Sequence, residues 1–234
     1  MLDTAIILAG GFGTRLQSVV SDLPKPMAPV NGKPFLEYVF KYCAASGISN
    51  CILSVGYKAD TIQNYFGSEF LNINVKYCVE ESPLGTGGAI KASMKITETD
   101  EVLILNGDTF FDVPVQDMYA LHNNAKSEFS IALKPLKNFD RYGIVKINDD
   151  LSISGFEEKA FRSAGNINGG VYIANKSILN HFPADEKFSF EKDFLEKQVG
   201  RLNMKGFLFD KYFIDIGIPE DYQKSQNEFE RFAY

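Results

Sequence analysis

The sequence contains no tryptophan, only two histidines and three cysteines, and no long run of lysine or arginine. With a formal net charge of -6, the missing basic run argues against nucleic acid or an anionic membrane as a partner. Cys43, Cys51 and Cys78 are odd in number and lack the spacing of a metal site, so we expect buried free thiols. His122 and His181 stand alone, without an obvious catalytic context. If the substrate is a phosphate, its counter-charge must therefore come from a few local Lys and Arg residues and a divalent metal.

The sequence also lacks a signal peptide, a transmembrane run, a linker and an internal repeat. We therefore expect a cytoplasmic protein with a single domain over residues 1–234, although this length would also allow two small domains. Hydrophobic residues make up 45% of the chain and charged residues 23%, which is the balance of a protein with a large core. Most of the 20 phenylalanines are expected in that core.

Apolar runs alternate with helical periodicity in the first half, about residues 1–125, and this alternation predicts parallel strands covered on both faces. The second half, about residues 126–234, has shorter strands, and Asp149-Asp150 is typical of a hairpin turn. We expect the last two strands to complete the sheet, and Pro219 to begin a closing helix that runs toward Phe232. The predicted strands are 5–8, 51–55, 74–79, 102–105, 131–133, 144–147, 153–156, 169–174, 204–209 and 212–216, and the other predicted helices are 35–45, 60–66, 89–95 and 190–198.

The first strand leads into the stretch Leu8-Ala9-Gly10-Gly11-Phe12-Gly13-Thr14-Arg15-Leu16. Its glycines would let backbone N–H groups approach a phosphate, and Arg15 supplies a planar cation. The stretch has no Walker A register, and Leu16 stands where the dinucleotide fingerprint requires glycine. Taken alone, it leaves two alternatives open, a phosphate loop of a third kind and a structural turn.

Acidic residues follow two predicted strands. Asp108 lies at the edge where α/β sheets collect ligands, although it could also be a turn residue. Asp215 is flanked by isoleucines, where a carboxylate is costly unless it is paired or bound to a cation. Mg²⁺ prefers carboxylate and phosphate oxygens, so both acids could hold one ion.

Two further stretches are ambiguous by themselves. Lys25 stands between two prolines, which favours an extended backbone that aims its ammonium in one direction or simply a rigid connector. Gly85-Thr86-Gly87-Gly88 fits either a plain helix entry or a flat backbone wall for a nucleobase.

Together these stretches resemble the signature of the sugar-phosphate nucleotidyltransferases, or sugar-nucleotide pyrophosphorylases, from Ala5 to about Pro219. Within that family, the likeness is greatest to guanylyltransferases acting on D-glycero-α-D-manno-heptose 1-phosphate. The resemblance implies an α/β, Rossmann-like nucleotidyltransferase fold with a mixed, mainly parallel central sheet. It also implies nucleotidyl transfer from a nucleoside triphosphate to a sugar 1-phosphate, with release of pyrophosphate, for cell-surface polysaccharide synthesis. Mg²⁺ is the implied cofactor, and a homodimer is allowed.

The same resemblance implies a role for each matching residue. Arg15 would hold the β- and γ-phosphates, Lys25 the reacting α-phosphate, and Lys159 the incoming sugar phosphate. Because a phosphate with a second pKa of about 6 is mostly dianionic at neutral pH, the reaction needs no general base. The implied catalytic residues are Arg15, Lys25 and Asp108, and the implied metal ligands are Asp108 and Asp215. The implied nucleotide contacts are Leu8, Ala9, Gly10, Gly11, Gly13, Thr14, Glu80, Gly85 and Thr86, and the implied sugar-phosphate contacts are Gly143, Glu158, Lys159, Asn168 and Gly169.

Glu80 carries the prediction of the nucleobase, because the family commonly places a base-reading residue five positions before Gly85. A carboxylate only accepts hydrogen bonds, and guanine offers two adjacent donors, whereas uracil and thymine offer one N–H between two acceptors. We therefore expect GTP over UTP and dTTP, with Glu81 as the alternative reader. Further alternatives are mannose 1-phosphate or another sugar 1-phosphate as substrate, and a non-catalytic regulator that binds sugar nucleotide.

Overall fold

A computed structural model describes residues 1–11 and 23–232, and its first half alternates strands and helices as the sequence predicts. The predicted helix 35–45 is observed at the same bounds, and its residues Phe35, Leu36, Val39, Phe40 and Cys43 are all buried. The elements of this half are β1 (Thr4–Leu8), the 3-10 helix η2 (Lys25–Met27), β2 (Pro29–Val30), β3 (Lys33–Pro34), α1 (Phe35–Ala45), β4 (Asn50–Val55), α2 (Ala59–Phe66), β5 (Glu69–Phe70), β6 (Ile73–Val79), α3 (Gly85–Lys95), β7 (Glu101–Asn106), β8 (Thr109–Phe111) and α4 (Val115–Asn124).

The second half contains longer strands and short helical turns. Its predicted strand 169–174 is the end of a strand that begins at Arg162, and its predicted helix 190–198 starts as a π-helix. The elements are β9 (Phe129–Phe139), β10 (Ile144–Ile147), β11 (Ile153–Glu157), β12 (Arg162–Asn175), the 3-10 helix η3 (Lys176–His181), the π-helix η4 (Phe190–Leu195), α5 (Glu196–Gln198), β13 (Met204–Leu208), β14 (Phe213–Asp215), α6 (Pro219–Glu228) and the 3-10 helix η5 (Phe229–Arg231).

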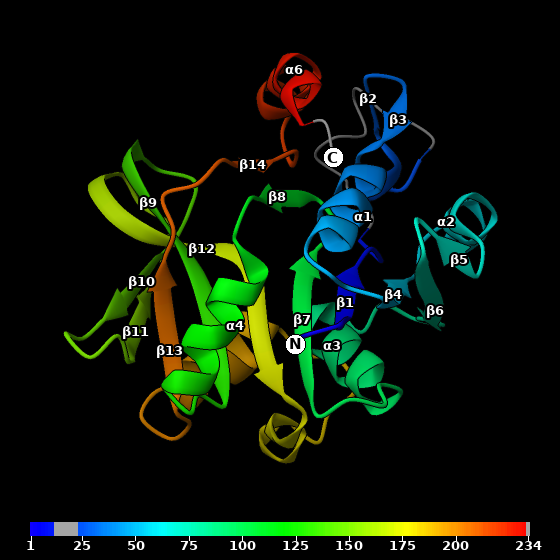
Figure 1. Ribbon diagram of the computed structural model, residues 1–234. Coiled ribbons are helices and arrows are strands. Elements are labelled where there is room, and N and C mark those ends of the chain that lie inside the picture. Colours follow the sequence, from blue (N-terminus) through cyan, green and yellow to red (C-terminus); the bar gives the residue numbers. More distant parts are fainter. Residues whose placement is uncertain (12–22, 233–234) are drawn as a thin grey trace.

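One continuous ten-stranded sheet spans both halves, in the order β11-β10-β12-β7-β1-β4-β6-β5, with β9 paired to β12 and β13 to β9 (Figure 1). Parallel pairing joins β7, β1, β4 and β6, while antiparallel pairing joins β12 to β7. The carboxyl ends of the four parallel strands therefore meet at one edge, where open α/β sheets bind ligands. The predicted α/β fold with a mixed, mainly parallel sheet is confirmed.

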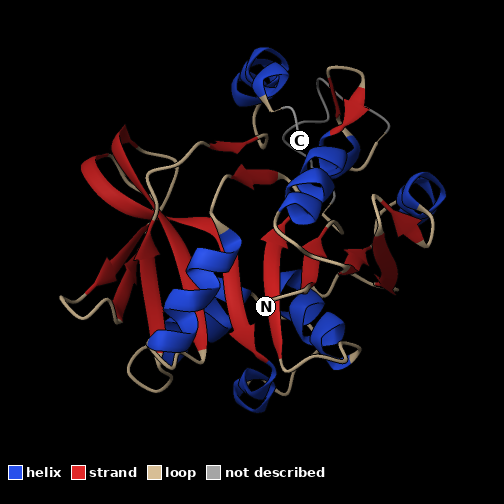
Figure 2. Cartoon of the chain, viewed as in Figure 1, coloured by secondary structure: helices blue, strands red, loops and turns tan. Residues whose placement is uncertain are grey.

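Helices cover both faces of this sheet (Figure 2). Side chains alternate along β1, so Ile7 packs in the core cluster that includes α1, and Ile6 in the cluster that includes α3. Both are fully buried, as expected for a strand that reads as an apolar run. Phenylalanines fill these cores as predicted, although Phe161 is 70% exposed.

Three local expectations are corrected. The strand around residues 212–216 does not join the central sheet, because β14 pairs with β8 in a separate antiparallel ladder where Phe213 packs edge-on against Phe111. Lys25 is not extended, because Met27 N–H donates to the Pro24 carbonyl and closes a 3-10 turn. Helix α3 begins at Gly85 instead of Ala89. Apart from these corrections, α4 is a helix that the sequence analysis did not predict.

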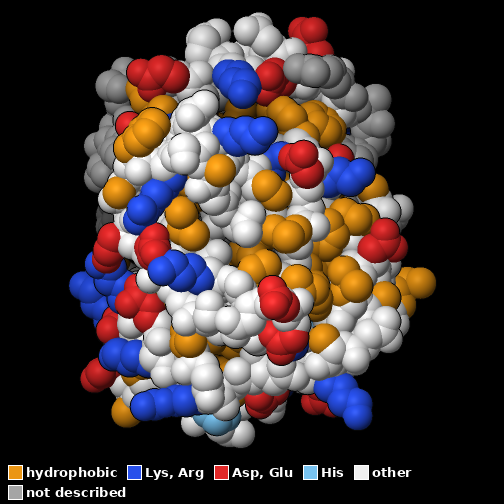
Figure 3. Space-filling model, turned by 90° about the vertical axis from the view of Figure 1, so that its left-hand side faces the viewer, with side chains coloured by type: hydrophobic (Ala, Val, Ile, Leu, Met, Phe, Trp, Pro, Cys, Tyr) orange, Lys and Arg blue, Asp and Glu red, His pale blue; other side chains and the backbone are white. Residues whose placement is uncertain are grey.

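The described helices include none that is both long and apolar enough to cross a membrane. On the face seen from the β9–β11 side, Lys and Arg side chains are interspersed with Asp and Glu (Figure 3). Cys43 and Cys51 are buried and Cys78 is half-buried, all as free thiols, as the sequence predicts.

Candidate functional site

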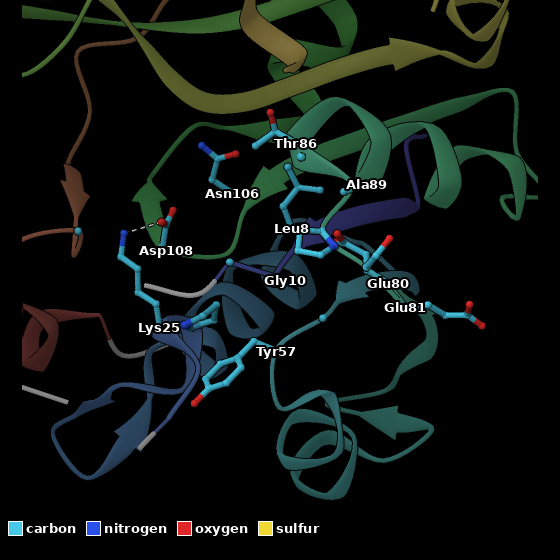
Figure 4. Close-up of a pocket in the computed structure, with 17 residues that line it drawn as sticks. Leu8, Gly10, Lys25, Tyr57, Glu80, Glu81, Thr86, Ala89, Asn106 and Asp108 are labelled. Carbon is cyan, nitrogen blue, oxygen red and sulfur yellow. Dashed lines mark hydrogen bonds and ion pairs between the residues drawn. The ribbon is translucent and has the colours of Figure 1, made fainter. Parts of the chain in front are cut away.

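Two adjoining pockets lie along the carboxyl edge of the parallel strands. The first pocket has a volume of about 590 Å³ and the second about 450 Å³, and Asn106 lines both. The first pocket is lined by Leu8, Gly10, Gly11, Lys25, Pro26, Gly56, Tyr57, Glu80, Glu81, Ser82, Pro83, Gly85, Thr86, Ala89, Asn106, Asp108 and Gly217 (Figure 4). The second includes Asn106, Thr109, Arg141, Tyr142, Gly143, Glu158, Lys159, Asn168, Gly169, Gly170, Glu191, Lys192 and Asp215.

Lys25 joins the two predicted acidic residues where the pockets meet. Its Nζ lies 2.5 Å from Asp108 Oδ2 (Figure 4). The same Nζ lies 3.5 Å from Asp215 Oδ1. The β8–β14 ladder brings the acids together, because Asp215 is the register partner of Thr109. The proline-flanked turn at η2 presents the ammonium, whose side chain is only 13% exposed. Three residues from distant parts of the sequence thus form one charged cluster.

Asp215 shows the electrostatic cost of this cluster. Burial, and next the nearby Asp108 charge, raise the pKa of the Asp215 carboxyl above its ordinary value, although Lys25 and the Gly217 backbone N–H oppose the rise. That N–H donates to Asp215 Oδ1 at 2.7 Å. A Cβ on Gly217 would stand 2.9 Å from Lys25 Nζ, so glycine leaves the room in which Lys25 and Asp215 meet.

The Asp108–Asp215 pair fits the requirement for a divalent cation. The Lys25 ammonium marks a point within reach of one oxygen from each carboxylate, which shows that both groups face one cationic position. Mg²⁺ commonly takes one or two protein carboxylates and completes its shell with phosphate oxygens and water. No cluster of three His, Cys, Asp or Glu side chains suited to a metal occurs within residues 1–11 and 23–232, so the remaining ligands would come from substrate and solvent.

Glu80 lies against the glycines of the first pocket with its carboxylate held at both oxygens. Ser54 Oγ donates to Oε1 at 3.2 Å, and Leu84 N–H donates to Oε2 at 3.0 Å. A Cβ on Gly10 would stand 2.5 Å from Oε1, so only glycine allows this close approach. Glu81, the alternative reader, is exposed and points away from the centre of the pocket (Figure 4).

The glycine-rich stretch after β1 is described as far as Gly11. Leu8, Gly10 and Gly11 line the first pocket. Ala9 is fully buried, and its N–H donates to the Ser54 carbonyl at 2.8 Å instead of facing the cavity. The predicted contacts Gly13, Thr14 and Arg15 lie outside the described residues.

The second glycine cluster begins α3, with Gly85 and Thr86 lining the first pocket. Gly87 and Gly88 are buried under the segment before η4: Gly87 N–H donates to the Phe188 carbonyl at 3.1 Å, and a Cβ on Gly88 would stand 2.1 Å from the Glu186 carbonyl oxygen. This close approach explains why α3 starts on residues that are poor helix formers. The cluster is therefore a helix entry, and only its first two residues reach the cavity.

The five predicted sugar-phosphate contacts, Gly143, Glu158, Lys159, Asn168 and Gly169, all line the second pocket. Glu158 and Lys159 are exposed at its rim, where Glu158 pairs with Lys192 at 2.9 Å. Gly169 is buried, and a Cβ there would stand 2.3 Å from the Phe111 ring.

Arg141 and Tyr142 were not singled out from the sequence, yet they also line the second pocket. Arg141 pairs with Asp221 of α6 and donates to the Tyr142 hydroxyl at 3.0 Å. No local sequence pattern identifies Arg141 as a pocket residue, because its ion-pair partner, Asp221, lies far away in the sequence. The adjacent Tyr142-Gly143, directly before β10, was the available signal.

The α/β sheet, with two pockets that meet at a lysine and two carboxylates, is consistent with a nucleotidyltransferase. The chain belongs to the Nucleotidyl transferase family, which it matches over residues 4–231. The predicted family and enzyme class are thus confirmed. The chain is 52% identical to the D-glycero-α-D-manno-heptose 1-phosphate guanylyltransferase of Aneurinibacillus thermoaerophilus, over 97% of this chain and 99% of that one. It is 51% identical to the protein of the same name from Campylobacter jejuni, over 93% and 96%.

A solved structure gives the same picture of the fold. The crystal structure of HddC from Yersinia pseudotuberculosis is 40% identical, with a TM-score of 0.88 over 98% of this chain and 100% of that chain. The structure of HddC complexed with GMP-PN matches with a TM-score of 0.86 at the same identity and coverage.

Proposed function

We propose that this protein transfers a guanylyl group from GTP to D-glycero-α-D-manno-heptose 1-phosphate and releases pyrophosphate. The observation that carries the proposal is the pair of adjoining pockets that meet at Lys25, Asp108 and Asp215. Two relatives at 52% and 51% identity bear the name of this guanylyltransferase, and the HddC complex contains GMP-PN, which supports guanine as the base.

The first pocket takes the nucleoside triphosphate, and the second takes the sugar 1-phosphate. An oxygen of the sugar phosphate forms a bond to the α-phosphorus, the bond from that phosphorus to the β-phosphate oxygen breaks, and pyrophosphate leaves with the electron pair. Lys25 offsets the negative charge of the α-phosphate where the two anionic substrates meet. Arg15 holds the β- and γ-phosphates, and Lys159 holds the sugar phosphate at the rim.

Asp108 and Asp215 would hold Mg²⁺, which supplies charge neutralisation to the phosphate oxygens when it is bound. The two carboxylates also accept hydrogen bonds from the Lys25 ammonium, so they orient Lys25 even before a metal binds. Glu80 reads guanine by accepting from its N1–H and amino group. Ser54 and Leu84 keep that carboxylate in place.

The wider setting of the reaction is also part of the proposal. A GDP-heptose product would serve cell-surface polysaccharide synthesis, and the reaction would take place in the cytoplasm. Both statements remain predictions, as do the homodimer and the interpretation of residues 1–234 as one domain with a nucleotide half and a sugar-phosphate half. The continuous sheet supports the single domain.

The proposal is tested by a panel of purified assays. GTP, ATP, UTP, CTP and dTTP are each combined with Mg²⁺ and with heptose 1-phosphate, mannose 1-phosphate or glucose 1-phosphate, and pyrophosphate release is followed. We expect the highest kcat/KM for GTP with the heptose phosphate. Mannose 1-phosphate is the second candidate, since relatives of 28–32% identity are named mannose-1-phosphate guanyltransferases or guanylyltransferases. A higher kcat/KM with mannose 1-phosphate would replace the sugar proposed here, and no turnover with any pair would refute the function.

A further inference from the structure

Asn106 is the one residue, among those that the structure describes, that lines both pockets. It ends β7, at the carboxyl edge of the parallel strands, and its register partner on β1 is Leu8. Asp108, two residues further on, belongs to the charged cluster with Lys25. Figure 4 shows the Asn106 side chain on the same side of the pocket as these two residues. Its carboxamide therefore stands where the reacting groups of two bound substrates would meet.

The position of this carboxamide is built into the fold. Gly170, on the neighbouring strand β12, has a φ of +72°, a conformation that side chains rarely adopt. A Cβ at this position would stand 2.7 Å from Asn106 Nδ2 and 3.1 Å from its Cγ. The glycine thus leaves the space that the Asn106 side chain occupies, while the next residue, Val171, pairs with Leu105 on β7.

Three other polar residues that line the two pockets already have protein partners. Asn168 donates from Nδ2 to the Tyr172 hydroxyl at 2.9 Å and accepts the Gly170 N–H at 3.0 Å. Thr86 Oγ1 accepts the Phe190 N–H, and Thr109 donates to Asp108. Within the described residues, the Asn106 carboxamide has no such hydrogen bond. Its two N–H donors and its acceptor oxygen are available to ligands.

We propose that Asn106 bridges the two substrates, with one N–H on an oxygen of the nucleotide α-phosphate and the other on an oxygen of the incoming sugar phosphate. The proposal rests on the proposed function. A neutral donor suits this place, because it can bind both anions without altering the charge balance of Lys25 with Asp108 and Asp215. Holding the attacking oxygen and the phosphorus together converts an encounter of two anions into a reaction within one complex.

Two substitutions separate this role from a packing role. Asn106→Ala removes the donors, and kcat should fall about 100-fold, the scale of losing one charge-stabilising donor. Asn106→Asp keeps the shape, but it adds a negative charge against two phosphates, so kcat should fall about tenfold further. If Asn106 only filled space, the aspartate variant would be milder than the alanine variant.

Two measurements and one control variant complete the experiment. Thermal melting reports whether each variant folds. Calorimetric titration with a nonhydrolysable GTP analogue, in the absence of sugar phosphate, measures nucleotide binding. The Kd of Asn106→Ala should lie within about threefold of the wild-type value, because one neutral hydrogen bond contributes little to the binding of a triphosphate held by several charges. Asn148→Asp, at the β10–β11 turn outside both pockets, is the matched control for an Asn-to-Asp change.

The outcomes distinguish the two proposals. A wild-type protein that releases no pyrophosphate refutes the proposed function itself. With an active wild type, near-normal turnover in the alanine variant, or an aspartate variant more active than the alanine variant, overturns the bridging role and leaves the function standing. Variants that fold and bind nucleotide, and lose turnover in the order expected, support the bridge.

Discussion

The first pocket contains a carboxylate held by hydrogen bonds to the protein, whereas the second pocket carries many of its charged groups at an exposed rim. In the first, Glu80 is fixed at both oxygens by Ser54 and Leu84. In the second, Glu158 and Lys192 form an ion pair with both side chains more than half exposed, and exposed pairs contribute little to stability. If the proposed assignment of the pockets holds, we expect the base to be selected by a carboxylate already held in place, and the sugar by exposed side chains.

The largest expected effect lies where the pockets meet. Lys25→Ala removes the ammonium held by Asp108 and Asp215, and turnover should fall at least about 100-fold. Arg15→Ala should have an effect of the same size, from loss of charge stabilisation on pyrophosphate. Steady-state kinetics checks both, with Lys33→Ala, which pairs with Glu37 on α1, as the control. Near-normal turnover in either variant would remove that residue from the catalytic set.

Glu80, the proposed reader of the base, should show the next largest effect. Glu80→Gln replaces one acceptor oxygen with a donor, so the preference in kcat/KM for GTP over UTP should fall about tenfold. Glu81→Gln is the matched comparison, because the neighbouring carboxylate is exposed and points away from the centre of the pocket. Loss of selectivity in Glu81→Gln alone would transfer the reading role to Glu81.

A smaller effect is expected at the rim of the second pocket. Lys159→Ala should raise the KM for the sugar 1-phosphate about fivefold and leave the KM for GTP nearly unchanged, because an exposed cation binds in water of high dielectric. Lys224→Ala, on α6 outside both pockets, controls for the loss of one charge. An equal change in both KM values would contradict the division of the two pockets between the substrates.

The smallest effect concerns the seam between the two halves of the chain, meaning the contacts of α4 with β9 and β12. His122 on α4 contacts Ser130 on β9 and Asn175 on β12, at 2.7 and 2.9 Å. Burial lowers the pKa of His122 below its ordinary value of 6.5, although the Asn175 hydrogen bond and the Glu101 charge oppose this. The unfolded chain therefore takes up the proton first, so this group's contribution to stability is present above pH 6.5 and is lost as the pH falls below it.

Melting curves recorded between about pH 7.5 and 5.5 check this sign, since histidine is the side chain that titrates there. The melting temperature of the wild type should fall more than that of His122→Gln. Parallel decreases would show that the seam does not sense pH through His122.

Much of the first half could be predicted because its signals are local. The apolar runs of β1 and β4 and the buried stripe of α1 each lie within one element, and the structure reproduces them. Helix α4 was missed although Val115, Met118 and His122 share a buried face. Its apolar stripe is narrow, and a histidine does not mark a core face.

The candidate site was partly predictable for a different reason. Residue types such as those of Asp108 and Asp215 suggested the chemistry. Their proximity depends on the ladder between β8 and β14, which no local sequence pattern predicts. The Arg141–Asp221 pair and the glycines packed under Phe188 are likewise contacts between distant segments. Asn106 illustrates the limit most clearly, because its placement between the pockets depends on Gly170 of another strand.

The β8–β14 ladder also determines when the cluster of Lys25, Asp108 and Asp215 can form during synthesis of the chain. Lys25 and Asp108 leave the ribosome in the first half of the chain, but Asp215 emerges only near its end. A nascent chain can therefore assemble β1, β4, β6 and β7 before its second acidic partner exists. The charged cluster of Lys25, Asp108 and Asp215 is therefore completed only after the strands of the central sheet have been synthesised.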